Sequence, residues 1–154
     1  EADIIVLAKS TGVLEFTTGT YGQEICVDSI IKGNEWIDEN ETCWIWRSYG
    51  MEVMDGQIVY RNVLNLMQDD GTYLVFLNSN QLNQYRTEKE FQTASEYFGY
   101  LPIEGAKVQP IKENQRNVLY KEWSEIPVFI SSEKVAAAWN EIAEMLLNKF
   151  EPDA

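Results

Sequence analysis

The pattern of apolar and polar positions in the first half of the chain predicts β-strands, with dense β-branched and aromatic stretches and a clear alternation over 24–31. We expect strands in the segments rich in β-branched and aromatic residues, namely 4–9, 15–20, 24–31, 41–47 and 72–77. The last of these is the most apolar and should be central in a sheet. Segment 58–60 is either a short strand or a loop.

The second half of the chain is less regular. The polar segment 78–93 is expected to be a long loop with a helical turn near 88–93. Two short strands are expected at 97–103 and 107–111. Pro102 and Pro110 place them at the edge of a sheet, because proline cannot donate a ladder hydrogen bond.

The C-terminal segment changes to a helical period. Ser131 or Ser132 is the expected N-cap. Apolar residues then recur at spacings of three and four, at Val135, Trp139, Ile142, Leu146 and Phe150. Trp139 is expected to be a core anchor on this stripe. We therefore predict one α+β domain over residues 1–154, mainly β over 1–111, with a helix over 131–150.

Charge narrows the classes of partner. The 154 residues include 12 Lys and Arg against 25 Asp and Glu, a net charge of −13. This charge repels phosphate backbones and anionic lipid headgroups, so nucleic acids and membrane surfaces are disfavoured as partners. No run reaches the roughly 18 apolar residues of a membrane-spanning helix. The chain begins at Glu1 instead of methionine, which indicates a trimmed or processed chain whose leader is missing.

The reactive side chains argue against catalysis. Histidine is absent, which removes the commonest general acid-base residue and excludes Cys-His and Ser-His-Asp mechanisms. Asp69 and Asp70 precede Gly71 and are expected to form a turn. The sequence has neither a glycine-rich phosphate loop nor a dedicated calcium loop. We expect no cofactor, no metal and no enzymatic activity.

Aromatic and acidic residues occur together in one segment. Trp36, Trp44 and Trp46 lie within eleven residues, and Tyr49 follows them. Four acids are interleaved with them, at Glu35, Asp38, Glu39 and Glu41. These acids form either a weak calcium site or, as we favour, a solvated loop rim.

Two interpretations of the tryptophans remain open. In one, the turn 34–40 and the outer face of strand 42–47 form a recognition surface for a cationic or carbohydrate ligand. In the other, Trp44 and Trp46, which share a face by alternation, point inward and fill the core.

Three stretches in order carry a resemblance. They are 2–9 (ADIIVLAK), 24–33, which ends in IIKG, and 70–77 (DGTYLVFL). Together they resemble a diffuse class of secreted or lipid-anchored bacterial domains. The layout is also similar to the oligonucleotide/oligosaccharide-binding-type (OB-like) barrel of netrin-like modules and of the N-terminal domain of tissue inhibitors of metalloproteinases. The likeness covers roughly the first half of the chain.

The resemblance implies a small antiparallel, OB-like β-barrel, on which the amphipathic C-terminal helix would pack. It also implies a location outside the cytoplasm, secreted or tethered to a bacterial membrane through a removed leader. Those metalloproteinase inhibitors reach the metal through an N-terminal cysteine. Residue 1 is Glu here, so that inhibitory chemistry is not carried over.

An oxidising location would permit a disulfide between the two cysteines, Cys26 and Cys43. They lie on successive predicted strands, and an antiparallel pairing can bring them within bridging distance. The alternative is two reduced, buried thiols that act as small hydrophobic side chains.

Three function classes follow. The favoured one is a non-catalytic binding or interaction module outside a bacterial cell. Its ligand would be an unknown protein or carbohydrate, with a basic ligand favoured by the acidic rim. The second is an inhibitor or immunity-type protein that blocks a basic target. The third is a hydrolase that uses two carboxylates in a cleft, roughly 5 to 10 Å apart, one of them with a raised pKa.

Overall fold

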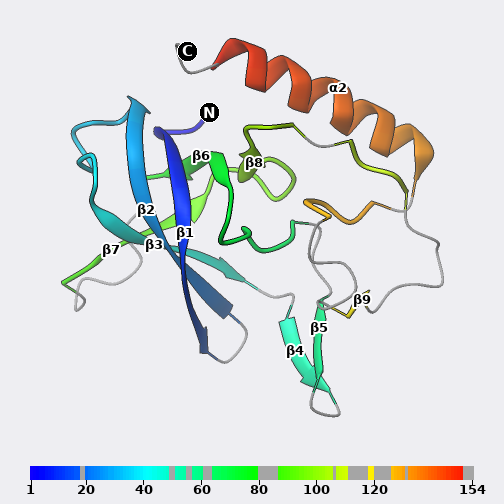
Figure 1. The fold of residues 1–154 in the computed structure, drawn as a ribbon, viewed down its shortest axis with the longest axis horizontal. Helices are drawn as coiled ribbons and strands as arrows, with labels where there is room; N and C mark the ends of the chain where they lie inside the picture. Colours follow the sequence, from blue (N-terminus) through cyan, green and yellow to red (C-terminus); the bar gives the residue numbers. More distant parts are fainter. Residues whose placement is uncertain are drawn as a thin grey trace.

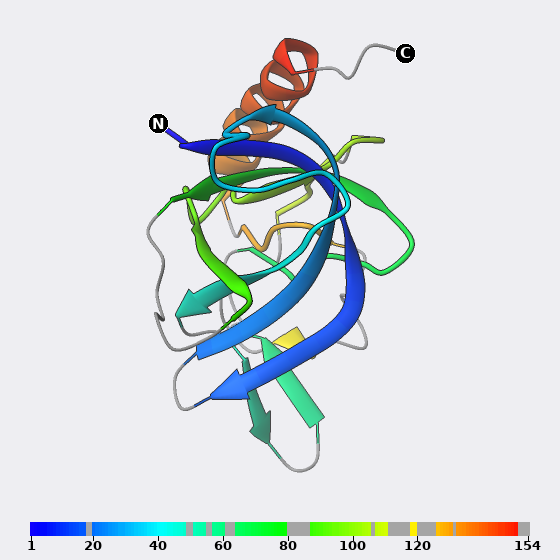
Figure 2. The ribbon, with the colours of Figure 1, turned by 90° about the vertical axis from the view of Figure 1, so that its left-hand side faces the viewer.

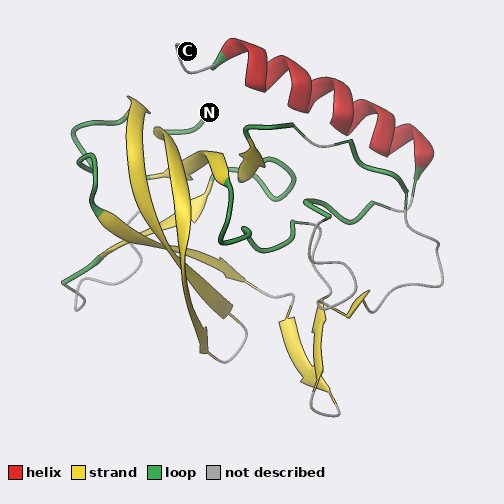
Figure 3. Cartoon of the chain, in the orientation of Figure 1, coloured by secondary structure: helices red, strands yellow, loops and turns green. Residues whose placement is uncertain are grey.

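The computed structural model describes residues 1–17, 20–48, 51–54, 57–60, 64–79, 87–105, 107–110, 118–119, 126–130 and 132–150. Over these ranges the chain forms strands and one α-helix, which confirms the α+β class (Figures 1 and 3). Their bounds are β1 (Ile4–Thr17), β2 (Thr20–Lys32), β3 (Thr42–Ser48), β4 (Met51–Met54), β5 (Gln57–Tyr60), β6 (Thr72–Asn78), β7 (Lys89–Thr93), β8 (Tyr100–Pro102), β9 (Val118–Leu119) and α2 (Glu133–Lys149).

Six strands pair in one sheet that closes into a ring. Their order is β1-β2-β3-β7-β6-β8, and β6 also pairs with β1. The β3–β7 pair is parallel and the other pairs are antiparallel. The strands wrap around a common interior, and α2 lies across one side of the ring (Figure 2). A second sheet has the order β4-β5-β9.

Residues 4–8 of β1 and 73–77 of β6 are buried on both faces, which explains their continuous apolar sequences. Ile4, Val6 and Ala8 of β1 are fully buried, and the alternate residues Ile5 and Leu7 are nearly so. In the register Ile5 lies opposite Phe76 and Leu7 opposite Leu74. These four side chains therefore share one face of the two strands. That face lies under α2, because the ring of Phe76 meets the ring of Phe150 edge to face, with centroids 5.8 Å apart.

The buried segment 64–67 is held to the ring by a side-chain amide. Gln23 of β2 donates from Nε2 to the backbone oxygen of Met67 (2.8 Å) and accepts from the Met67 N–H at Oε1 (3.1 Å). A buried loop needs such partners for its backbone polar groups. Gln23 is thus an inward polar side chain whose role is structural.

Arg47 is a buried cation on the inward side of β3. Only 7% of this residue is exposed, and Nη1 donates to Thr93 Oγ1 (3.3 Å). Within the described ranges it forms no ion pair, and Nε has no hydrogen-bond partner. Burying a charge without a counter-charge costs free energy, so replacing Arg47 should change the free energy of unfolding.

The C-terminal helix begins where the sequence predicted. Ser132 is the N-cap, and its hydroxyl accepts from the Val135 N–H at 3.4 Å. Trp139 is confirmed as a core anchor: it is buried, its indole stacks on Phe98, and its Nε1 donates to the Tyr97 carbonyl at 3.1 Å. The expected stripe was wrong at Val135 and Ile142, which are exposed.

The inward face of α2 is built from smaller residues than predicted. Ala136, Trp139 and Ala143 are its buried positions, and Leu146, Leu147 and Phe150 pack partly against the core. Alanine lets the helix approach the sheet more closely than valine or isoleucine would. Val135 and Ile142 therefore remain exposed, and Trp139 is the one large residue of the helix that is buried against the sheet.

Several other strand predictions need correction. The segments predicted as separate strands at 4–9 and 15–20 belong mainly to one long β1, which is irregular between Ser10 and Leu14. Residues 89–93, predicted as a helical turn, form β7. Only Tyr100–Pro102 of segment 97–103 is a strand, at the end of the sheet order as Pro102 predicted. Residues 107–110 form no strand.

Candidate functional site

The loop between β2 and β3, residues 33–41, has a defined backbone path. It begins at Gly33, whose φ is +97° and where a Cβ would lie 3.0 Å from the backbone of Asp3 and Ile4. It ends near Asn40, which has a φ of +64°. The Trp36 N–H donates to the Gly33 carbonyl (2.9 Å), which closes the first turn. We call these nine residues the β2–β3 loop.

The middle of the β2–β3 loop is attached to the hydrophobic core and to β2. Ile37 is 1% exposed and belongs to the hydrophobic core. The Asn40 N–H donates to the Val27 carbonyl (2.7 Å), which ties the end of the loop to β2. A loop with one buried side chain and several backbone bonds loses less entropy on binding than a free loop does.

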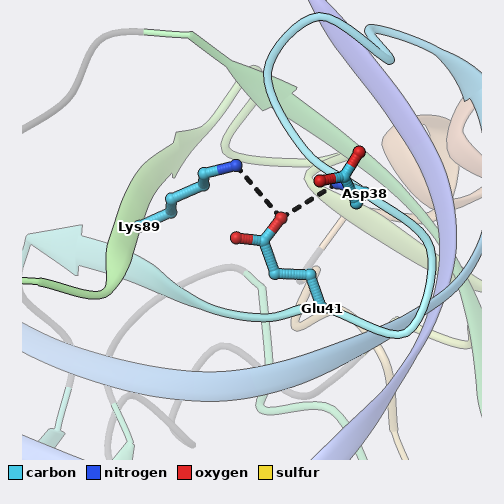
Figure 4. A network of polar contacts seen from close by, with 3 residues as sticks. All are labelled: Asp38, Glu41 and Lys89. Carbon is cyan, nitrogen blue, oxygen red and sulfur yellow. Dashed lines mark hydrogen bonds and ion pairs between the residues drawn. The ribbon is translucent and has the colours of Figure 1, made fainter.

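Glu41 has a structural role instead of a place on an open rim. Its Oε2 accepts from the Asp38 N–H at 2.9 Å and from Lys89 Nζ at 3.0 Å (Figure 4). Lys89 comes from β7, so the contact joins the loop to a strand 48 residues away in sequence. The ion pair is only partly buried and contributes little by itself. Its main effect is to neutralise Glu41 and to fix the loop.

The remaining candidates in the β2–β3 loop face solvent. Trp36 is 39% exposed, which is high for such a large side chain. Glu35, Asp38 and Glu39 are also exposed. The structure therefore brings one accessible indole and three carboxylates together on a fixed loop, next to the N-terminus in Figure 1.

Trp44 and Trp46 lie on the outer face of β3. The alternate residues Cys43 and Ile45 belong to the buried core, so the two indoles point away from the interior. Their rings stack with centroids 6.1 Å apart and planes inclined by 27°. The interpretation in which Trp44 and Trp46 point inward and fill the core is therefore wrong.

Trp44 is nevertheless inaccessible on that outer face. Only 5% of it is exposed, and its Nε1 donates to Glu88 Oε2 at 2.6 Å. Trp46 is partly exposed and lies over Gly22, where a Cβ would come within 2.9 Å of the indole Cε2 atom. Of the two, Trp46 is the one that solvent reaches. Tyr49, the fourth aromatic candidate, lies outside the described residues.

The two cysteines are free thiols on opposite faces of the sheet. In the β2–β3 register Ile25 lies opposite Cys43, whereas Cys26 lies opposite Thr42. This offset of one residue turns the two side chains to different sides, so the proposed disulfide is not formed. Burial raises the pKa of the Cys43 thiol to about 12. Cys43 therefore packs as a neutral core side chain.

The sequence missed Lys89 and Glu88 as parts of this region. Both precede or begin β7, and their contacts with Glu41 and Trp44 span more than 40 residues of sequence. Local patterning carries no signal for such contacts. Across the described ranges, no three cysteine or acidic side chains form a group suited to a metal ion.

A membrane-spanning helix and similarity to known proteins were both considered for this chain. Among the described residues, no helix has both the length and the apolar character needed to cross a bilayer. Searches against protein-family models, curated proteins and solved structures found no significant match.

Proposed function

We propose that this chain is a non-catalytic binding module that recognises a basic protein partner through the β2–β3 loop. The observation that carries the proposal is the exposure of Trp36 on a loop whose backbone is held by Ile37 and Glu41. Tryptophan is the residue most enriched at binding hot spots. Preorganisation of its loop lowers the entropy lost on association.

Electrostatics favour a basic partner. Glu35, Asp38 and Glu39 are exposed on the same loop as Trp36, while Glu41 is paired with Lys89. The chain as a whole carries a net charge of −13. Such a surface accelerates encounter with cationic proteins and repels acidic ones, and the effect weakens as salt is added. An inhibitor or immunity-type protein with a basic target would use the same loop.

The finer fold assignment is part of the proposal. We infer an OB-like barrel because β1, β2 and β3 form a meander, β7 joins β3 in parallel, and β6 closes the ring onto β1. OB-folds use the face of their second and third strands for ligands. Here Trp46 lies on the outer face of β3, near the end of the strand that is farther from the β2–β3 loop.

A location outside the cytoplasm is part of the proposal and rests on the resemblance of segments 2–9, 24–33 and 70–77 to secreted and lipid-anchored domains. The codons directly upstream of Glu1 test it. A signal peptide or a lipobox cysteine supports it, and an initiating methionine directly upstream contradicts it.

A carboxylate-dependent hydrolase is less well supported. The cavity between α2 and the sheet has two glutamates, Glu104 and Glu144, and both are exposed at its mouth. A general acid instead needs a carboxyl group whose pKa is raised by a desolvated environment.

Binding of two matched peptides tests the proposal. An arginine-rich peptide and a glutamate-rich peptide of equal length are titrated against the protein by fluorescence anisotropy, at low and high salt. We expect binding of the basic peptide only, weakened by salt. Trp36→Ala should lower the affinity roughly tenfold or more. Tyr97→Ala is the control, because Tyr97 is 40% exposed but lies in the segment that contacts α2.

Three results would refute this assignment. They are equal binding of the acidic peptide, unchanged affinity of the Trp36→Ala variant, and an equal loss in both aromatic variants. Circular dichroism of each variant separates loss of binding from loss of folding.

A further inference from the structure

A cavity of about 550 Å³ lies between α2 and the outer face of β1 and β6. Its size falls within the usual range of small-molecule sites, roughly 300 to 1,000 Å³. It is separate from the β2–β3 loop, because its lining comes from β1, β6, the segment after β8, and the C-terminal half of the helix.

The cavity exists because α2 is attached to the domain on both sides of it. Near the middle of the helix, Asn140 Oδ1 accepts from the Val108 N–H (2.8 Å), and Nδ2 donates to the Val108 carbonyl (3.1 Å). At the C-terminal end the Phe150 ring contacts Phe76. Between these attachments Ala143 is too small to fill the space above Leu7 and Leu74.

The floor of the cavity is apolar. Leu7 and Leu74 lie opposite each other in the β1–β6 register, and both are almost completely buried. Ala143 and Leu147 of α2 face the same space. A hydrocarbon group would displace water mainly from the more exposed apolar lining residues, Ile103 and Leu147, and would gain hydrophobic stabilisation there.

The mouth of the cavity is charged. Glu104 and Lys107 follow β8 on one side, and Glu144 lies on α2 on the other. All three are exposed, and none forms an ion pair with another described residue. Gly105 lies between them, and a Cβ there would meet no atom within 4 Å. The entrance is thus open and its charges are available to a ligand.

The electrostatic balance at this mouth is negative. Two carboxylates and one ammonium leave a charge of −1. The lining residues Ala143, Glu144, Leu147 and Asn148 lie in the last two turns of α2 and Phe150 is its C-cap, so the negative end of the helix dipole faces the same region, partly offset by Lys149 in the last turn. A cationic head group is therefore favoured there over a neutral one, and an anionic head group is disfavoured.

We propose that this cavity binds a small amphiphilic cation, an amine with a hydrocarbon body. The hydrocarbon lies against Ile103 and Leu147, above Leu7 and Leu74, and the ammonium lies between Glu104 and Glu144. The inference is independent of the function proposed for the β2–β3 loop. Trp36→Ala leaves it unchanged.

Three ligands with the same chain and different heads test the chemistry: n-octylammonium, 1-octanol and octanoate. Their binding to the full chain is followed by methyl-resolved NMR, with the Leu7, Leu74 and Leu147 methyl signals as reporters. We expect the amine to bind about three- to tenfold more tightly than the alcohol, because partly exposed charge pairs contribute modestly. Octanoate should bind most weakly. Octanoate binding as tightly as the amine, or no binding by any of the three, would overturn the proposal.

Two variants locate the ligand. Ala143→Leu fills the cavity and should abolish the methyl shifts, whereas Ala138→Leu, on the exposed side of the same helix, should leave them intact. Glu104→Gln combined with Glu144→Gln should remove the preference for amine over alcohol without weakening the alcohol. If Ala143→Leu fails to fold, the wild-type methyl map and the double glutamine variant still decide. Shifts confined to methyls outside the cavity, or an amine preference that survives the double variant, would contradict it.

Discussion

The contact between Gly22 and Trp46 makes a sharp prediction about the outer face of the β2–β3 sheet. An ideal Cβ on Gly22 would lie 2.9, 3.0 and 3.1 Å from the Cε2, Cζ2 and Cδ2 atoms of the Trp46 indole. Carbon atoms in favourable contact are about 3.5 to 4.0 Å apart. Gly22→Ala must therefore displace the indole by roughly 0.5 to 1 Å, against its stacking on Trp44.

The expected magnitude combines two opposing effects. Overpacking of this kind costs about 1 to 3 kcal/mol. Replacing a strand glycine by alanine returns roughly 0.5 to 1 kcal/mol through the lower entropy of the unfolded chain. The two effects together give a range of about 0 to 2.5 kcal/mol, so we expect Gly22→Ala to lower the free energy of unfolding by about 1 kcal/mol.

Urea denaturation of a double-mutant cycle measures this effect. With Trp46→Ala in place, Gly22→Ala should be neutral or slightly stabilising, because the overlap no longer exists. Gly71→Ala is the matched control, since its Cβ would meet only Tyr73 Cε2, at an ordinary 3.4 Å. The reasoning is refuted if Gly22→Ala destabilises both backgrounds equally.

Three further predictions concern charge and protonation. Arg47→Met should raise the free energy of unfolding by about 1 kcal/mol or more, because it replaces a buried guanidinium that has no carboxylate partner in the described ranges. A lower free energy of unfolding in urea titrations would contradict this. Folding raises the pKa of Cys43 from 9.0 to about 12, so the stability that its neutral thiol contributes should be lost as the pH rises from 9 towards 12. Cys43→Ala should make the alkaline loss of stability smaller. Identical alkaline stability profiles of the variant and the wild type would refute this. Hydrogen bonds from the Ser79 backbone and side chain lower the pKa of Asp3 below 3.8, so the stability that its carboxylate contributes should be present above that pH and be lost as the pH falls. The free energies of unfolding of the wild type and of Asp3→Asn should therefore converge in acid. An acid stability profile that Asp3→Asn leaves unchanged would count against this.

Patterns that depend on local composition were predictable from the sequence. The run over 72–77 is apolar on both faces because one side lines the ring and the other lies under α2, and its central place followed from that composition. Ser132 was identifiable as a cap because a hydroxyl before a helical period satisfies a free backbone N–H.

The orientation of α2 was not predictable from its period. Two overlapping stripes have helical spacing, one through Val135 and Ile142 and the other through Ala136 and Ala143, and Trp139 belongs to both. Hydrophobicity favours the larger residues, whereas the close approach of the sheet selects the alanines.

Long-range pairing determined the remaining differences. β7 has the sequence KEFQT, in which only Phe91 is apolar; its conformation depends on the parallel pairing with β3. Long-range pairing also explains why some residues of the candidate site are buried or structural and others are accessible. Glu41 became a structural residue because β7 placed Lys89 beside it, and Trp44 became covered, so Trp36 is left as the accessible indole of the loop.

The indole N–H signals of the native protein test the central claim most directly. The chain has five tryptophans, and each gives one such signal in a ¹H–¹⁵N spectrum. During titration with the arginine-rich peptide we expect the Trp36 signal to move and saturate, while the buried Trp139 signal, bonded to the Tyr97 carbonyl, stays fixed. A stationary Trp36 signal at saturating peptide would contradict the account.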